Sequence, residues 1–417
     1  MALAKDGCLR ALPQRTPSPP LRAVGGRARK ELASKFRAAS EASCGYPCAV
    51  TPLSLHEFHE RLGARFSEVN GAEVVEHFGD AGREYTALRQ SVGVVDLSFR
   101  GRLCVTGADR ARFLHGQITN DVTGLRPGQG CYAALVTAKG KLESDLNVHC
   151  LAEELLLDFE PGLSARLRQR LEGFIVADDV QVVDVAPHYG LLGAFGPKAT
   201  EAVERIGWAV RLPTEPLASA TVKDATLGEI VIVNHSRGAT AGFDLFVPAA
   251  ALPEVAEKLV AAANETGGRA CGWSALEMIR IEAGLPRFGV DMDESNLAPE
   301  TGIEARAISH TKGCYIGQEV INKLRTFAHV TRTLRGLRLA DDLNALPLRG
   351  DKLFRENKEV GYVTSALASL AFRRNIALGY VRRECNEPGT ELVLRAAGGE
   401  SAARVVSLPF DGQELAK

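Results

Sequence analysis

Residues 131–149 read Cys-Tyr-Ala-Ala-Leu-Val-Thr-Ala-Lys-Gly-Lys-Leu-Glu-Ser-Asp-Leu-Asn-Val-His, and this stretch decides the class of fold. Two runs with strand composition, 131–137 and 141–149, flank the turn-forming segment 138–140, so the pattern predicts a β-hairpin. Side chains alternate along a strand, so apolar residues of the second run face one way and polar ones the other. The polar face carries Glu143, Asp145, Asn147 and His149. Such a polar face lies against solvent or lines a site.

Strands and helices mix on both sides of this hairpin, and no glycine-rich phosphate-binding loop interrupts them. This order, with its hairpins, favours an α+β fold with mixed sheets over a doubly wound parallel sheet. Helices are expected at 53–66, 109–114, 163–174, 197–206, 252–264 and 273–283. Strands are expected at 92–95, 103–105, 155–159, 180–185, 191–195, 229–233 and 243–247. The helical spacing through 53–66 places His56 and His59 on a helix face and not in a metal site.

Beyond Val330 the pattern contains strands only, at 334–339, 360–364, 376–381, 392–394 and 405–408. Several short strands in succession predict a small C-terminal β-barrel. A chain of 417 residues exceeds what a single core usually fills, so two or three domains are expected. We predict an extension at 1–50, a main region at 51–328 and a barrel domain at 329–417.

Residues 1–50 are rich in Ala, Arg, Pro and Ser, with nine Lys or Arg and three Asp or Glu. Such a segment buries little apolar surface and is predicted to be disordered or removable. A mitochondrial presequence is the alternative to a solvated tail, although amphipathic helical patterning is poor. Cys44 and Cys48 lie here at a spacing too common to indicate a metal site.

Composition excludes several classes of protein. The chain is 45% apolar and 24% charged, and no apolar run approaches the roughly 20 residues needed to span a bilayer. The net charge is −1 although the first 50 residues are basic, so the rest of the chain is acidic and unsuited to nucleic acid. Nine scattered cysteines indicate reduced thiols and predict a cytoplasmic protein, or one of an organelle matrix.

The stretch Lys312-Gly313-Cys314-Tyr315-Ile316-Gly317-Gln318-Glu319 brings an amine, a thiol, an amide and a carboxylate into eight residues. Its two glycines predict a shaped loop, and a helix is expected to start at Gln318. A thiolate is the reactive form of cysteine, and the Lys312 charge two residues away would favour it at Cys314. We therefore predict a site at this loop.

Three further groups of polar residues are candidates for ligand binding. They are Asn120-Asp121 with Tyr132, the Glu143 and Asp145 face of the hairpin, and the acidic loop from Asp291 into Glu300. Carboxylates and amides can match the alternating N–H and C=O groups of an amide-rich heterocycle. For any one of these acids, a solvated or helix-capping role is the alternative.

Several motifs in order resemble the aminomethyltransferase (glycine-cleavage T-protein) superfamily over residues 51–410. They are Thr51-Pro52-Leu53, Asp96-Leu97-Ser98, Thr119-Asn120-Asp121-Val122, Arg280-Ile281-Glu282-Ala283-Gly284-Leu285, Asp291-Met292-Asp293-Glu294, Pro299-Glu300-Thr301-Gly302 and Gly361-Tyr362-Val363-Thr364-Ser365. The stretch from Lys312 to Glu319 resembles the signature of one branch, the YgfZ-type folate-binding proteins tied to iron–sulfur cluster assembly and repair.

The resemblance implies T-protein-like domains around a central pocket for tetrahydrofolate or a one-carbon-substituted form of it. Residues with the implied folate-binding role are Asn120, Asp121, Tyr132, Arg280, Glu300, Tyr315, Gln318 and Glu319. Cys314, Lys312 and Asp145 are the candidates for chemistry, and no metal ligand is predicted because one cysteine cannot hold a cluster.

Two departures separate the chain from true T-proteins. Ser144 replaces one carboxylate of the pair that would include Asp145, and segment 238–244 is shorter and lacks the glutamate that contacts folate. Losing polar partners of a buried ligand should weaken the alignment of a one-carbon donor. Whether the chain is an enzyme therefore stays open at this point.

Three functions are compatible with the resemblance. The first is a tetrahydrofolate-binding accessory protein for iron–sulfur cluster assembly or repair, with assembly factors or client iron–sulfur proteins as partners. The alternative is a folate-dependent aminomethyltransferase or demethylase that moves a one-carbon group to tetrahydrofolate. A folate-storing protein is the third. Folate is the small-molecule partner in each, and none requires nucleic acid or a membrane. The compartment would be the cytoplasm, or the mitochondrial matrix if residues 1–50 are a presequence.

Overall fold

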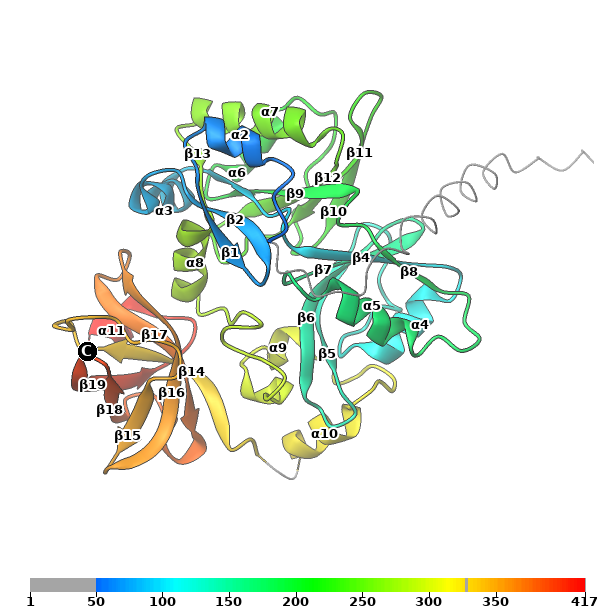
Figure 1. The fold of residues 1–417 in the computed structure, drawn as a ribbon. Coiled ribbons are helices and arrows are strands. Elements are labelled where there is room, and N and C mark those ends of the chain that lie inside the picture. The colour runs from blue at the N-terminus through cyan, green and yellow to red at the C-terminus, as the bar shows by residue number, and fades with distance from the viewer. Residues whose placement is uncertain (1–49, 327–328, 417) are drawn as a thin grey trace, which may run out of the picture. The chain divides into compact units, whose positions relative to one another are not determined.

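The computed structural model describes residues 50–326 and 329–416, and Figure 1 shows their fold. Residues 50–417 group into one compact unit. The extension predicted at 1–50, with Cys44 and Cys48, therefore lies outside the described residues except for Val50. The boundary predicted between 328 and 329 remains a prediction.

Helices and sheets alternate as the α+β prediction requires. The helical elements are α2 (His56–Arg61), α3 (Ala81–Gln90), α4 (Arg110–Gln117), α5 (Ser164–Glu172), α6 (Ala199–Glu204), α7 (Leu252–Glu265), α8 (Trp273–Glu282), η1 (Ala298–Glu300), α9 (Glu304–Ala307), α10 (Gln318–Thr326), η2 (Arg383–Cys385) and α11 (Gly412–Ala416).

Two larger sheets form the part of the chain before the barrel. The six-stranded sheet has the order β10 (Ser219–Asp224), β11 (Gly228–Asn234), β12 (Gly242–Pro248), β9 (Tyr189–Phe195), β3 (Gly93–Asp96) and β13 (Arg269–Ala270). The five-stranded sheet has the order β5 (Gly130–Val136), β6 (Leu142–Cys150), β7 (Glu154–Phe159), β4 (Gly101–Thr106) and β8 (Gln181–Asp184). A separate hairpin pairs β1 (Arg65–Val69) with β2 (Ala72–His77). The pair β13–β3 is parallel and its neighbour β3–β9 is antiparallel, so the larger sheet is mixed.

The C-terminal strands close into a barrel, drawn from yellow to red in Figure 1. Its order is β14 (Arg332–Leu339), β17 (Arg374–Arg382), β16 (Lys358–Ser369), β15 (Lys352–Arg355), β18 (Glu391–Ala396) and β19 (Gly399–Val406), which pairs again with β14. Closure leaves no free sheet edge, and the inward side chains, including Leu337, Leu353 and Val405, form a core of their own. The predicted barrel is confirmed, with β15 as a strand that the pattern did not reveal.

Apolar side chains between the layers fix the sheets in place. Leu252, Val255 and Leu259 of α7 pack with Leu192 and Ala194 of β9 on one face of the six-stranded sheet. A second cluster joins α3 and α8 to strands of both larger sheets. The α8 helix therefore lies where the sheets meet, and the loop that follows it reaches the candidate site.

Most of the expected elements are present in the structure, and the largest difference lies near the start of the described chain. The hairpin of β5 and β6 has the predicted position, with Tyr132 opposite Asn147 and Ala134 opposite Asp145. The helix expected over 53–66 is wrong beyond Arg61, because Gly63 adopts a positive φ of 80° and Phe66 lies on β1. The strand β10 and helix α3 were not expected. The His59 side chain lies in the core, where its Nε2 is 2.8 Å from the Asp96 carboxylate.

Buried Asp291 ties α8 and the loop behind it to the barrel. The Asp291 carboxylate accepts from Arg280 of α8 at 2.5 Å, and from Thr364 and Ser365 of β16 at 2.6 and 2.7 Å. The side chain is 1% exposed, so these donors replace the water that a carboxylate needs. This contact fixes Arg280 relative to the barrel.

Substituting Asp291 tests the importance of this contact. We expect Asp291→Ala to lower the free energy of unfolding by about 3 kcal/mol, because it removes one of the two carboxylates that pair with the buried Arg280 charge and leaves Glu277 as the other. Denaturant unfolding measures the change. Asp342→Ala, at an exposed position of the barrel, is the control and should change stability by less than about 0.5 kcal/mol. Equal effects of the two substitutions would contradict a structural role for Asp291.

Candidate functional site

A cavity of about 430 Å³ lies between the β5–β6 hairpin, α8 and the loop after α8. We call it the Asp145 cavity. Its volume is within the range of small-molecule sites. The residues that line it are Leu97, Arg100, Asn120, Cys131, Tyr132, Asp145, Asn147, Glu160, Pro216, Leu217, His235, Arg237, Trp273, Leu276, Glu277, Arg280, Leu285, Pro286, Arg287 and Arg306.

Asp145 and Glu160 are the carboxylates of this cavity with a buried oxygen that accepts no hydrogen bond in the described chain, and only the Glu160 oxygen lies near a cation, 3.5 Å from Arg287. The Oδ2 of Asp145 accepts from the Tyr132 hydroxyl at 2.8 Å, whereas its buried Oδ1 has no hydrogen-bond partner among the described residues. Burial, reinforced by the nearby Glu160 charge, raises the pKa of Asp145 to about 6. The carboxyl group is therefore able to hold or release a proton near neutral pH.

Paired charges form the wall next to Asp145. Asp158 accepts from Arg100 at 2.7 Å, from Arg237 at 2.9 Å and from Asn147 at 3.0 Å. Although burial opposes ionisation, these two guanidinium groups hold the pKa of Asp158 well below its usual range. Asp158 is thus a permanent anion, in contrast to Asp145.

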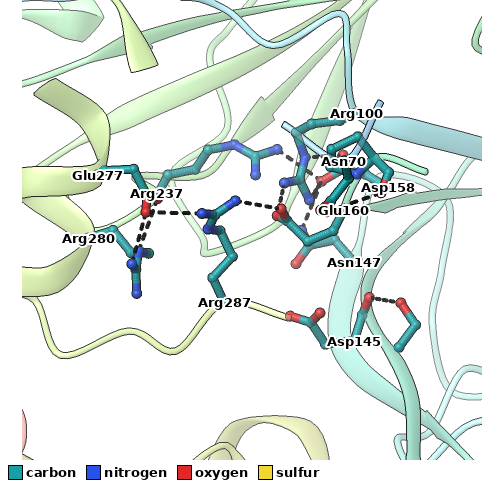
Figure 2. Close-up of polar contacts among 12 residues, drawn as sticks. Asn70, Arg100, Asp145, Asn147, Asp158, Glu160, Arg237, Glu277, Arg280 and Arg287 are labelled. Carbon is teal, nitrogen blue, oxygen red and sulfur yellow. Dashed lines mark hydrogen bonds and ion pairs between the residues drawn. The ribbon is translucent and has the colours of Figure 1, made fainter. Parts of the chain in front are cut away.

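Glu277 organises a second group of charges on the side of α8. It pairs with Arg280 at 2.9 Å and with Arg287 at 3.3 Å, and Arg287 also lies 3.5 Å from Glu160 (Figure 2). The Arg287 guanidinium lies 4.9 Å from the centre of the Trp273 ring. Figure 2 shows this chain of charges extending from α8 across to the five-stranded sheet.

Lys312 lies elsewhere, against the end of α4. Its ammonium donates to the backbone oxygens of His115, Ile118 and Asn120 at 2.5, 2.8 and 2.9 Å. A cation at the carboxyl end of a helix is favourable, and it occupies carbonyls that the helix leaves unpaired. Burial lowers the pKa of Lys312 to about 8. The amine therefore anchors the predicted loop on residues 115–120.

The rest of the 312–319 loop does not line the Asp145 cavity. Cys314 is exposed, Tyr315 is buried in an apolar cluster, and Glu319 is exposed on α10. Gln318 begins α10, as predicted, and its amide lies 3.5 Å from the Gly313 oxygen. The thiol that does line the cavity is Cys131, and burial raises its pKa to about 12, so it stays protonated.

Two other candidates also lie outside the Asp145 cavity. The Asp121 carboxylate accepts from the backbone and hydroxyl of Thr123 and lies 3.1 Å from His115, an arrangement that closes its own turn. Glu300 accepts from the Leu297 backbone at 3.1 Å. It lines a separate cavity of about 900 Å³ that includes Tyr362 and Tyr380 of the barrel.

The structure therefore brings together four of the predicted site residues, Asn120, Tyr132, Asp145 and Arg280. Sequence reasoning did not select the arginines and acids that surround them, namely Arg100, Asp158, Glu160, Arg237, Glu277, Arg287 and Arg306. These residues come from separate elements, and each resembles an ordinary surface charge in the sequence. The sequence of β7 contained one weak indication of a buried charge, because Asp158 follows a run of three leucines within the strand.

The described part of the chain shows neither a metal centre nor a membrane span. Within residues 50–326 and 329–416, no three His, Cys, Asp or Glu side chains converge as metal ligands would. No helix in the same ranges has the length and apolarity to cross a bilayer.

Comparison with known proteins identifies the family of this chain. The family model of the GCVT N-terminal domain matches residues 55–312, and that of the glycine cleavage T-protein C-terminal barrel domain matches residues 332–411. The chain belongs to the glycine cleavage T-protein family.

Individual relatives are similar over nearly their whole length. The chain is 29% identical to an aminomethyltransferase of Thermotoga neapolitana and 27% identical to one of Halalkalibacterium halodurans, with 86% of this chain and 97% of each relative covered. The crystal structure of the glycine cleavage system aminomethyltransferase T from Bartonella henselae has the same fold. Its TM-score is 0.78 at 24% identity, covering 88% of this chain and 99% of that one.

The raised pKa of Asp145 predicts a pH-dependent effect on stability. The folded pKa of about 6 exceeds the usual value of about 3.9, so the folded state binds the proton more tightly and stability falls as pH rises between these values. Asp145→Asn has no charge to desolvate. We expect its stability relative to the unmodified protein to rise by about 2 kcal/mol from pH 4 to pH 7.5, since one pKa unit is worth about 1.4 kcal/mol.

Denaturant unfolding at several pH values measures this difference. The control is Asp342→Asn on the exposed barrel surface, whose difference from the unmodified protein should not vary with pH. A pH-independent difference for Asp145→Asn would show that the cavity does not perturb this carboxyl group.

Proposed function

We propose that this chain binds tetrahydrofolate, or a one-carbon-substituted form of it, in the Asp145 cavity, and that the bound folate accepts a one-carbon group. The observation that carries the proposal is Asp145, which lines a ligand-sized cavity and whose buried Oδ1 has no hydrogen-bond partner in the described chain. A buried polar atom of this kind is costly unless a ligand or water satisfies it. Relatives over nearly the whole chain are named aminomethyltransferase.

The chemistry of the lining suits a reduced pterin. Asp145 offers an acceptor for a ring N–H, and Asn120 belongs to the same wall. Tyr132, Trp273 and Leu276 supply aromatic and apolar surface for a flat ring. Fixed arginine–carboxylate pairs surround this surface and need no rearrangement to hold a polar ligand in one orientation.

The transfer that we propose involves no net oxidation. An aminomethylated donor loses its methylene carbon to two folate nitrogens, which give up one proton each, and the donor group and ammonia leave with those protons. Asp145 would accept a proton in its ionised form and donate one in its neutral form, since both forms are present near pH 6. Its contact with Tyr132 keeps the carboxyl group oriented during the exchange.

Thermal unfolding with tetrahydrofolate tests the binding step. A ligand at about 100 times its dissociation constant stabilises the folded state by about 2.7 kcal/mol, so a clear rise in the melting temperature is expected. Asp145→Asn should reduce the rise, and Asp342→Asn should leave it unchanged. No rise for the unmodified protein at saturating tetrahydrofolate would contradict the proposal.

A turnover assay tests the transfer step separately. Purified protein with tetrahydrofolate and a panel of methylated and aminomethylated amines should form methyl- or methylene-tetrahydrofolate, and Asp145→Asn should lower the rate at least about 100-fold. Folate binding without any product from the panel would reject the transferase and keep the binding protein.

The 312–319 loop favours a second candidate function, a YgfZ-type accessory role in iron–sulfur cluster assembly or repair. Cys314 is exposed on a loop that Lys312 holds in place through three hydrogen bonds, so its thiol is available to a partner protein. Ser144 and the shortened segment 238–244 are further reasons to consider a folate-binding protein that is not a transferase. Assembly factors or client iron–sulfur proteins would then be the partners, in the cytoplasm or a mitochondrial matrix.

Replacement of the thiol tests this second function. In cells that lack the native factor, we expect Cys314→Ala to restore cluster-dependent enzyme activities at most to about a tenth of the level reached with the unmodified protein, since the thiolate is the reactive form. Cys385→Ala, which alters a buried barrel thiol, is the control and should restore them fully. Full restoration by Cys314→Ala would remove the thiol from the proposed role.

A further inference from the structure

Arg306 differs from the other arginines that line the Asp145 cavity. Arg100, Arg237, Arg280 and Arg287 each pair with at least one carboxylate. Arg306 is exposed, and residues 50–326 and 329–416 place no carboxylate within ion-pair distance of it. It is therefore a cation at the cavity rim whose charge the described chain leaves uncompensated.

The backbone of Arg306 is held firmly although its side chain is free. Arg306 lies on the short helix α9, and its carbonyl oxygen accepts from the Asn120 side chain at 3.2 Å. The next carbonyl, that of Ala307, accepts from the Thr119 hydroxyl at 2.7 Å. These contacts satisfy the end of α9 and fix the origin of the Arg306 side chain relative to the β5–β6 hairpin.

Tyr132 links the position of Arg306 to that of Asp145. The Arg306 guanidinium lies 5.1 Å from the centre of the Tyr132 ring, and the hydroxyl of the same ring donates to Asp145 at 2.8 Å. One tyrosine side chain thus contacts both a cation without a carboxylate partner in the described chain and the Asp145 carboxyl group that lines the cavity. A ligand held by both groups must carry N–H donors at one end and an anion at the other.

We propose that Arg306 binds a carboxylate of the glutamyl tail of folate and makes the cavity selective for folates over pterins that lack this tail. The inference rests on the proposed folate binding and names the part of the ligand that the rim recognises. A guanidinium presents N–H groups in a planar fork that matches a carboxylate. Contact with the Tyr132 ring keeps the guanidinium near the cavity and so reduces the entropy lost on binding.

Charge in the cavity supports this assignment. Glu160 and Glu277 already satisfy the paired arginines, so a ligand carboxylate placed among them would meet both signs of charge. At Arg306 it would meet a positive charge and no described acid. An anionic group is therefore best placed at the rim, with the neutral ring inside.

Binding measurements with two ligands test the role of Arg306. One ligand is tetrahydrofolate, and the other is 6-methyl-tetrahydropterin, which has the reduced ring but no glutamyl tail. We expect Arg306→Gln to weaken binding of tetrahydrofolate about tenfold, the effect of losing one charge-assisted hydrogen bond. Binding of the pterin should change less than about twofold. Arg306→Lys keeps the charge but not the planar fork, so it should weaken tetrahydrofolate binding less than Arg306→Gln does.

The control variant is Arg211→Gln, at an exposed arginine that does not line the cavity, and it should change neither affinity. Calorimetric titration measures all affinities, and thermal unfolding without ligand checks that each variant folds. Where the unmodified protein binds both ligands, Arg306→Gln could weaken the binding of both equally or of neither. Either result would show that Arg306 does not bind the glutamyl tail. If the unmodified protein binds neither ligand, the proposed folate binding fails and this inference fails with it.

Discussion

The structure around the candidate site depends on one buried carboxylate, Asp158, and the two arginines that neutralise it. An unpaired charge at this depth would cost several kcal/mol, so Arg100 and Arg237 must both approach. Arg100 precedes β4 of the five-stranded sheet, and Arg237 follows β11 of the six-stranded sheet and also binds Asp244. Asp158 therefore couples the two larger sheets, and its partners Arg100 and Arg237 line the cavity.

Charge compensation distinguishes two acids of the five-stranded sheet, Asp145 on β6 and Asp158 on β7. Asp158 has two guanidinium partners and remains ionised, whereas Asp145 has a tyrosine hydroxyl, a free oxygen and the negative Glu160 nearby. The environment, and not the residue type, makes Asp158 a structural ion-pair partner and allows Asp145 to exchange a proton. The cavity is thus rigid in its paired charges and adaptable at Asp145 and Arg306.

The functional groups of the 312–319 loop are adjacent in the sequence but do not converge on one site in the structure. The loop's amine turns away from the cavity to bind three carbonyls at the end of α4, its tyrosine enters an apolar cluster, and its thiol faces outward. Three side chains within eight adjacent residues therefore lie in three different environments. The loop anchors one side of the fold and presents Cys314, while the candidate ligand site is assembled from other elements.

The sequence by itself determined the α+β class, the hairpin of β5 and β6, the barrel and the candidacy of Asp145 and Tyr132. Each of these follows from local alternation, turn residues or short motifs, which act over a few neighbouring residues. Only the tertiary structure decided that Arg100, Arg237, Arg287 and Arg306 join them, and that Asp121 and Glu300 do not. Contacts between charges on distant elements depend on how sheets pack, and no local pattern encodes that packing.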